Sequence, residues 1–454
     1  MATSKSANDA FTSEYEAYCQ SNGTPAQLEL LLCDLNGVFR GKWLPGDAAE
    51  KLTKGAVRLP LSTYAPGIMG HEVEESGLGI VIGDPDGILV PVPGTLRPAP
   101  WLGADTAQVL VEMTDKTGAI SPNSPREKLS TMLTRFADKG LRPVVATELE
   151  FYILRARTER SDPPVPPAFT PDAQNYDAEV LARHQGMLGE ILSVSAAQGL
   201  PTDTLIAEYG QGQFEINFHH TEDVLAAAET ALLFRRLVRG VVASHGLEAT
   251  FMAKPYADDP GNGMHVHASV LDRDGKNIFT PSADETLSAN LQNAVAGLLV
   301  TMPDLQAIFA PHGNSYRRYL PDSFAPAQPD WGFDHRAAAV RLPETTGPAA
   351  RLEHRVAGAD TNPYLSLAAI LGGMLHGLQT KPPLPPALDA NDAIPAKHME
   401  HDWTAALDRF ATSETAAEIF GPYRDLYTTV KREEIRTIQS AITPAEYTYY
   451  LSRF

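Results

Sequence analysis

The sequence is poor in cysteine, in basic residues and in long apolar runs, and each shortage excludes a class of protein. Cys19 and Cys33 are the only cysteines, so neither a disulfide framework nor a thiolate metal site is expected. The 37 Lys and Arg residues against 56 Asp and Glu residues give a formal charge of −19. This balance argues against a nucleic acid or an anionic membrane surface as a partner.

The longest apolar stretch, residues 364–378, is too short to span a membrane, and residues 1–11 lack the hydrophobic core of a signal peptide. We therefore expect a cytoplasmic protein in which residues 364–378 form a buried helix. The nucleotide-binding patterns GxxxxGK[ST] and GxGxxG are also absent. Any nucleotide site is therefore neither of the P-loop type nor of the kinase type.

The order of sequence patterns predicts two domains behind a polar leader, residues 1–24. With 43% hydrophobic and 20% charged residues, the chain is long enough for two full cores. Short apolar runs separated by turn signals predict a small sheet-rich domain over residues 25–116. A helix with Ser124 as N-cap and Pro125 at its first position then precedes strand-like segments that alternate with long helical patterns. Residues 117–454 are therefore predicted to form a mixed α/β domain.

Four strand-like segments, ELEFYI, GQFEINF, GMHVHASV and RLEHRV, each carry one polar and one apolar face. Side chains alternate between the two faces of a strand, so residues two apart point the same way. The apolar faces are rich in Phe, Val, Leu and Met, which indicates that they pack on a core. The polar faces are formed by Glu148 with Glu150, Glu215 with Asn217, His265 with His267 and Ser269, and Arg351 with Glu353 and Arg355.

Each polar face, taken alone, has a simple structural explanation. A Glu-x-Glu pair is more often part of a solvated or salt-bridged surface than of a ligand site. A His-x-His strand is as often an ordinary polar face as a ligand site. An Arg-x-Glu-x-Arg strand usually forms a ladder of cross-strand pairs on the surface. The four faces therefore line either solvent or a cavity. In a shared cavity their carboxylates could not stay unpaired, and such an oxygen-rich site suits Mg²⁺ or Mn²⁺. Two or more ions would then be held by Glu148, Glu150, Glu208, Glu215, His265 and Glu353.

Six arginines supply the complementary charge: Arg317, Arg318, Arg336, Arg341, Arg351 and Arg355. A guanidinium group binds carboxylates and phosphates through a fixed fork of donors. Divalent cations and arginines around one cavity indicate phosphoryl transfer, in which catalysis is mostly positioning and charge neutralisation.

Five segments, ELEFYIL, GQFEINF, GMHVHAS, NSYRR and RLEHRVAGADTNPYLSLAAIL, occur in an order and spacing typical of one enzyme family. In these segments the chain resembles the glutamine synthetase family, from about residue 28 to its end. The segments DLNGVFRGK, VVATELEFY, ATFMAKPY and RVAGADTNPYL are similar to those of the γ-glutamylputrescine (γ-glutamylpolyamine) synthetase branch. The resemblance implies an α+β fold: a small β-grasp-like N-terminal domain and a glutamine-synthetase-type catalytic α/β domain with a barrel-like antiparallel sheet.

The resemblance also implies an ATP-dependent ligase. ATP would phosphorylate the γ-carboxylate of glutamate, and a nitrogen nucleophile would displace phosphate from the resulting γ-glutamyl phosphate. In the family pattern, Glu150, Glu208 and Glu215 would hold one metal ion, and Glu148, His265 and Glu353 the second. Glutamate would be bound by Gly261, Arg318, Arg336 and Arg355. The residues facing ATP would be His267, Ser269, Arg341 and Arg351. Catalysis would involve Arg336, Arg355 and His265.

Two departures from the family pattern concern the amine. Residues 57–70 lack the DGSS loop of the ammonia-using enzymes, and Phe324 stands where their flap carries a Glu. Without a carboxylate in the site, nothing would compensate an ammonium ion for the hydration it loses on binding. A larger amine, in contrast, gains roughly 0.8 kcal/mol for each methylene that it buries. We expect an alkyl amine, putrescine or another polyamine, to pack against Phe324, Trp331 and Phe333. Simple packing of the flap explains each of these aromatic residues equally well.

Three alternatives stay open. The amine could be a monoamine or ethanolamine, the reaction could be ordinary glutamine synthesis, or the chain could be a non-enzymatic structural relative, against which the intact ligand set argues. A diamine needs an anionic group at the far end of its pocket, near which Asp322, Asp330 and Asp334 lie in sequence. Family members form rings of six, usually stacked in pairs. We therefore expect a homo-oligomer with small-molecule substrates and with neither nucleic acid nor membrane as a partner.

Overall fold

The computed structural model describes residues 2–320, 323–388 and 399–454, which form two β-sheets with helices around them. The first sheet has the strand order β2-β1-β6-β4-β3, with β5 paired to β6. Its central pair, β1 and β6, is parallel and the other pairs are antiparallel. The strands are β1 (Gln27–Cys33), β2 (Phe39–Pro45), β3 (Arg58–Pro60), β4 (Asp86–Pro91), β5 (Arg97–Pro98) and β6 (Thr106–Thr114), and the short helix α2 (Glu50–Thr53) follows β2.

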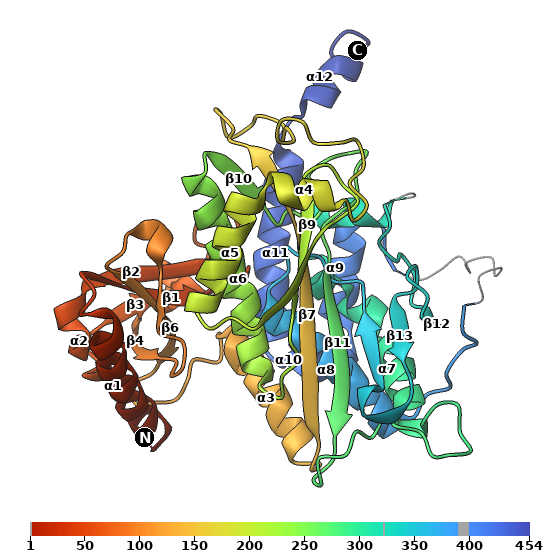
Figure 1. Cartoon of the computed structure of the whole chain (residues 1–454), viewed down its shortest axis with the longest axis horizontal. Helices are drawn as coiled ribbons and strands as arrows, with labels where there is room; N and C mark the ends of the chain where they lie inside the picture. Colours follow the sequence, from red (N-terminus) through yellow and green to blue (C-terminus); the bar gives the residue numbers. More distant parts are fainter. Residues whose placement is uncertain (1, 321–322, 389–398) are drawn as a thin grey trace.

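The first residues, predicted only to be a polar leader, form the helix α1 (Ala2–Asn22), which lies beside the first sheet (Figure 1). Phe11 is 1% exposed and belongs to the core of that sheet, where Tyr15 and Tyr18 pack against it. The Glu14 carboxylate accepts hydrogen bonds from the backbone N–H groups of Gly94 and Leu96 at 2.8 and 2.9 Å. This helix is therefore part of the folded N-terminal unit.

The second sheet carries all four segments whose polar faces the sequence predicts. Its strand order is β12-β13-β14-β11-β7-β9-β8, with β10 paired to β7, and every pair except β12 with β13 is antiparallel. The strands are β7 (Arg142–Arg155), β8 (Thr202–Ala207), β9 (Gln213–Phe218), β10 (Leu247–Thr250), β11 (Met264–Leu271), β12 (Trp331–Phe333), β13 (Val340–Glu344) and β14 (Arg351–His354). The long strands β7 and β11 run side by side through the middle of the molecule (Figure 1).

Helices cover the second sheet and supply most of the large core. They are α3 (Pro125–Ala137), α4 (Ala178–Arg183), α5 (Gln185–Ala197), α6 (Val224–Ser244), α7 (Ala289–Phe309), α8 (Pro363–Thr380), α9 (Trp403–Thr412), α10 (Glu414–Phe420) and α11 (Tyr423–Ser440). The last helix, α12 (Pro444–Tyr450), buries no residue and projects away from the sheet (Figure 1). The predicted cap of α3 is confirmed, because the Ser124 side chain accepts from the Glu127 N–H. The predicted buried helix at residues 364–378 is α8. None of the helices in the described part of the chain is long and apolar enough to cross a membrane.

Helices α7 and α8 touch through their backbones. A Cβ built on Gly377 would lie 2.0 Å from the Asn293 carbonyl oxygen, and one on Gly297 would lie 2.4 Å from the Gly377 Cα atom. Any larger side chain at these two positions would force the helices apart. The fold class predicted from the sequence is confirmed, and the domain boundary near residue 117 stays a prediction.

A buried polar cluster connects α11 to the first sheet. The Lys431 ammonium, whose side chain is 1% exposed, donates to Asn36 Oδ1 at 2.7 Å and to Glu434 Oε2 at 2.9 Å. Asn36 lies in the turn between β1 and β2, and the other Glu434 oxygen lies 2.7 Å from His312 Nδ1. His312 caps the 3₁₀ helix η6 (Gly313–Tyr319), which carries Arg318. The cluster therefore ties the N-terminal sheet to η6.

Candidate active site

Strand register brings the predicted ligands into neighbouring rows. Glu148 of β7 lies opposite His265 of β11 on one side and Asn217 of β9 on the other, and Glu150 lies opposite Glu215. The next pairings set His267 opposite Glu353 and Glu353 opposite Arg341. Directly paired residues of adjacent strands share a face. The polar faces of the four predicted strands therefore belong to one surface.

The opposite faces of these strands are buried in the core, as the alternation predicts. Leu149 and Phe151 of β7, Ile216 of β9 and Val266 of β11 are fully buried, and Leu352 of β14 is too. The apolar faces fix which way each strand sits on the core. The polar residues between them are therefore forced to the other side, where they line a cavity rather than open solvent.

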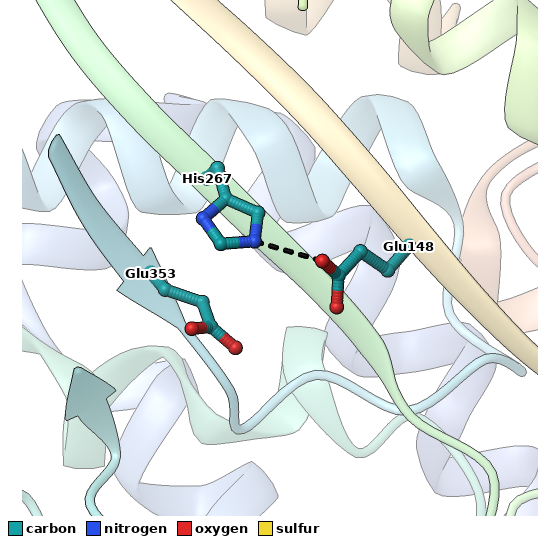
Figure 2. Close-up of side chains that lie close together, drawn as sticks. All are labelled: Glu148, His267 and Glu353. Atoms are coloured by element: carbon teal, nitrogen blue, oxygen red, sulfur yellow. Dashed lines mark hydrogen bonds and ion pairs between the residues drawn. The ribbon is translucent and has the colours of Figure 1, made fainter. Parts of the chain in front are cut away.

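Three ligand-type side chains from three strands converge in Figure 2: Glu148 from β7, His267 from β11 and Glu353 from β14. His267 Nε2 lies 2.9 Å from one Glu148 oxygen, and His265 Nδ1 lies 3.2 Å from the other. The Glu148 carboxylate thus bridges two imidazoles across the β7–β11 pair.

Glu208, just beyond the end of β8, and Glu215, on β9, are at least partly buried beside other carboxylates. Burial, and then the charge of Glu148, raises the pKa of Glu215 well above its ordinary value. Burial and the charge of Glu150 raise the pKa of Glu208 to about 7. Within the described residues, no Lys or Arg forms an ion pair with Glu208 or Glu215. Burial and repulsion between the carboxylates therefore disfavour the ionised forms of Glu208 and Glu215, and a cation between them would offset this cost.

Glu148 and Glu353, which lie next to histidines and arginines, have pKa values below the ordinary value. Burial raises the pKa of Glu148, but its hydrogen bonds with His265 and His267 outweigh burial and hold the pKa below its ordinary value. For Glu353, burial is outweighed by the charges of His265 and Arg355, so its pKa is lowered too. These two carboxylates are therefore ionised at neutral pH and available as ligands.

The donor set fits divalent cations. Ligand atoms of Glu148, Glu215 and His265 all lie within 4.8 Å of one another, and so do those of Glu148, His267 and Glu353. Oxygen-rich sets with one imidazole and no sulfur suit a hard divalent ion. The first set combines members of the two predicted ligand groups, so the assignment of each side chain to one particular ion stays a prediction.

Arginines face the same cavity, which has a volume of about 610 Å³. Arg318 is 3% exposed, and its Nη1 donates to the Val356 carbonyl at 2.9 Å, while its buried Nε has no partner among the residues that the structure describes. A Cβ on Gly261 would lie 2.6 Å from the Arg318 side chain, so only glycine leaves this space open. The lining includes all six predicted metal ligands and four predicted glutamate-binding residues: Glu148, Glu150, Glu208, Glu215, His265, Glu353, Gly261, Arg318, Arg336 and Arg355.

The residues predicted to face ATP are divided between two cavities. Arg341 lines the first cavity, and His267, Ser269 and Arg351 line a second one of about 540 Å³. Glu148 and Asn217 line both cavities, which therefore adjoin at the metal-type cluster. This arrangement provides separate spaces on either side of one group of carboxylates.

Of the three aromatic residues predicted for the amine, Phe324 lines the first cavity, whereas Trp331 and Phe333 are outside its lining. The Trp331 Nε1 donates to the Pro385 carbonyl at 2.8 Å, and its ring packs on Phe333 at 5.3 Å. Tyr209, which the sequence analysis missed, lines the cavity beside Phe324. Tyr209 lies just beyond the end of β8, where strand alternation no longer tells which way a side chain points.

The aspartates considered for a second ammonium group are engaged elsewhere or undescribed. Asp330 accepts a hydrogen bond from the Ala339 N–H at 2.8 Å. Asp334 accepts from Arg341 Nε at 2.9 Å. Asp322 lies outside the described residues.

Comparison with known proteins agrees with this geometry. Residues 122–450 match the family described as glutamine synthetase, catalytic domain. The chain is 37% identical to the γ-glutamylputrescine synthetase PuuA of Escherichia coli (strain K12), over 97% of this chain and 95% of that protein. It is 31% identical to a glutamate–isopropylamine ligase of Pseudomonas sp, over 92% of this chain and 93% of that one. The solved GmaS/ADP complex superposes with a TM-score of 0.83 at 27% identity, covering 96% of this chain and 99% of GmaS. On this evidence the chain belongs to the glutamine synthetase family.

Proposed function

We propose that the protein is an ATP-dependent ligase that joins the γ-carboxyl group of L-glutamate to an alkyl amine, with putrescine or a related polyamine as the amine. One observation carries the proposal: a single cavity combines clustered buried carboxylates, a buried arginine and an exposed aromatic side chain, Phe324. The first two features are those of phosphoryl transfer onto a carboxylate, and the third belongs to the amine. The names of the relatives, a γ-glutamylputrescine synthetase and a glutamate–isopropylamine ligase, support an amine rather than ammonia.

The residues of the chain can be given roles in two chemical steps. In the first, the γ-carboxylate of glutamate attacks the γ-phosphorus of ATP, so ADP leaves and γ-glutamyl phosphate forms. In the second, the amine nitrogen attacks the acyl carbon, phosphate leaves and the nitrogen gives up a proton. Mg²⁺ or Mn²⁺, two or more per site, would neutralise the charge on the transferred phosphoryl group. Glu148, Glu150, Glu208, Glu215, His265 and Glu353 would hold these ions.

The arginines bind and orient the reacting groups. Arg318 lies in the cavity wall and is held by the Val356 carbonyl through Nη1, so the rest of its guanidinium is positioned to take a carboxylate of glutamate. Arg355 is fixed by Glu353 and by the Arg336 carbonyl. In a cavity that excludes water, such preorganised donors stabilise developing negative charge strongly. The nucleotide is then bound by the residues predicted to face ATP, which are Arg341, His267, Ser269 and Arg351.

Phe324 decides between ammonia and a larger amine. It has an aromatic ring where ammonia-using relatives carry a carboxylate, and its side chain is 68% exposed within the cavity wall. Each methylene that an amine buries against such a ring contributes about 0.8 kcal/mol. An ammonium ion gains no such contact. A monoamine is the second candidate, because Asp330 and Asp334 are already engaged by Ala339 and Arg341.

The test is phosphate release with ATP, Mg²⁺ and glutamate against ammonia, putrescine, spermidine, ethanolamine and simple monoamines. We expect an alkyl amine to give the highest kcat/KM and product mass analysis to show the γ-glutamyl amide. Ammonia as the best substrate would make the protein an ordinary glutamine synthetase. Absence of Mg²⁺-dependent turnover with every amine would make it a structural relative without activity.

We propose further that the enzyme works in the cytoplasm as a double hexameric ring. The support is the family membership together with Cys19 and Cys33, which are both free thiols. Size-exclusion chromatography with light scattering would distinguish a hexamer from a dodecamer.

A further inference from the structure

Tyr209 and Phe324 form an aromatic pair in the wall of the active-site cavity. Their ring centroids lie 5.4 Å apart with the ring planes at 51°, so the rings form a V rather than a stack. Both residues line the cavity that also holds Glu208. Tyr209 is 45% exposed, which leaves part of each ring accessible to a further group.

The backbone fixes the two rings separately. The Tyr209 N–H donates to the Glu208 carboxylate at 3.3 Å, and its carbonyl accepts from the Gln174 N–H at 3.0 Å. Phe324 has a φ of 60°, in the left-handed region that a bulky residue adopts only when its surroundings demand it. The ring contact therefore joins two independently held segments, the bend after β8 and the segment after η6.

Among the described residues, the cavity wall offers the far end of a diamine no carboxylate other than the predicted metal ligands. In the described part of the chain, the acidic residues of its wall are the predicted metal ligands Glu148, Glu150, Glu208, Glu215 and Glu353. Those ligands would be occupied by metal ions during the reaction. An ammonium group can instead bind over an aromatic face, within about 6 Å of the ring centroid.

We propose that Tyr209 and Phe324 hold the second ammonium group of a diamine by cation–π contact, while the carbon chain of the diamine covers the same rings. This inference rests on the proposed function and names the substrate class that the site selects: a primary amine with an apolar chain and a cationic far end. It makes Tyr209 a specificity-determining residue that acts together with Phe324.

The test compares putrescine with n-butylamine, which has the same carbon chain but no second charge. The ratio of their kcat/KM values, from ATP-dependent phosphate release, isolates the contribution of the second ammonium group. Tyr209→Leu keeps an apolar side chain and removes the aromatic face, so we expect the preference for putrescine to fall about 3- to 30-fold. Tyr209→Phe keeps the face and should retain the preference.

Two further variants complete the design. Phe324→Leu should lower the ratio in the same direction, which protects the test against a folding defect in one variant. Phe169→Leu is the matched control, because Phe169 is an aromatic residue that is 88% exposed and lies outside the cavity wall. We expect this control to keep the wild-type ratio.

The outcomes separate this inference from the proposed function. If Tyr209→Leu and Phe324→Leu turn over both amines at the wild-type ratio, the cation–π assignment is overturned and the ligase function stands. If Tyr209→Phe lowers the ratio as far as Tyr209→Leu does, the hydroxyl rather than the ring face binds the ammonium, and the assignment is also overturned. If the wild type uses neither these two amines nor any other alkyl amine, the proposed function itself fails.

Discussion

Arg341 Nη1 donates to Glu353 Oε2 over 2.7 Å, and Glu353 is completely buried. The same guanidinium also holds Asp334 through Nε at 2.9 Å. A predicted nucleotide-binding arginine is therefore bound to a predicted metal ligand. When nucleotide and metal ion bind, the contact between Arg341 and Glu353 would therefore either be kept, with both residues also contacting the ligands, or be broken.

Arg341→Ala should lower ATP-dependent phosphate release by about 100-fold or more, because a charged donor in a water-poor site is lost. The fold should persist, since Glu353 keeps its ion pair with Arg355. Circular dichroism and the phosphate assay measure the two effects. Arg341→Lys, which keeps the charge but not the fork of donors, is the control and should recover part of the activity. Unchanged activity in the alanine variant would refute the role of Arg341.

Mg²⁺ should raise the melting temperature more at pH 8 than at pH 6. Folding raises the pKa of Glu215 and raises that of Glu208 to about 7. The folded state therefore holds protons that the unfolded state releases, so without metal these groups cost stability as pH rises from their ordinary pKa through about 7. Mg²⁺ would replace the protons and remove this cost.

Differential scanning fluorimetry with EDTA or Mg²⁺ at both pH values checks this expectation. Glu215→Gln should melt higher than the wild type in EDTA at pH 8, because a buried carboxylate without a cationic partner is gone, and it should gain less from Mg²⁺. An equal gain from Mg²⁺ at both pH values, or in the variant, would contradict the assignment.

Lys431→Met should reduce the free energy of unfolding by about 3–5 kcal/mol at pH 7, because Glu434 would be left buried beside His312 without its cation. Urea denaturation measures the loss. Burial raises the pKa of Glu434, but Lys431 and His312 outweigh it and hold the pKa at about 2. This contribution is therefore present above the ordinary carboxyl pKa and disappears as pH falls to about 2.

Lys54→Met is the matched control for that experiment. Lys54 pairs with Glu50 one helical turn away, and both side chains are largely exposed. Solvent screens such a pair, so its removal should have no measurable effect. Equal losses in the two variants would show that the Lys431 cluster does not stabilise the fold.

Phe324→Glu should shift the acceptor preference from n-butylamine toward ammonia by about tenfold or more, because a carboxylate compensates the lost hydration of ammonium and removes apolar contact. The measurement is the ratio of kcat/KM values for the two acceptors. Phe324→Gln has the same size without the charge and should lower butylamine use without improving ammonia use. If Gln improves ammonia use as much as Glu does, the charge is not the cause.

The sequence alone could predict the surface on which the site lies, because strand alternation is set by backbone geometry. Leu149 and Val266 had to face the core, so Glu148 and His265 had to face away from it. The sequence could not predict the strand register. The pairing of β7 with both β9 and β11 brings Glu148 close to ligands from distant parts of the chain, and long-range pairing leaves no local signal.

Features outside the four predicted strand segments were harder to predict. Trp331 was a candidate for the amine pocket, but its Nε1 donates to the Pro385 carbonyl and it is outside the lining of the first cavity, so its role there stays a prediction. Helix α1 was missed because its apolar stripe consists of little more than Phe11, Tyr15 and Tyr18. Three apolar residues in a polar segment are too few to distinguish a docked helix from a solvated leader.

The paired rows on β7 and β11 restrict how the gene can change in length. Deletion of a single codon between Val145 and Glu148 would turn every following side chain of β7 over, placing the core residue Leu149 in the cavity and a carboxylate in the core. Loss of two codons would restore the faces and only shift the register. Length changes in these strands can therefore keep polar and apolar faces apart only when codons are gained or lost in pairs.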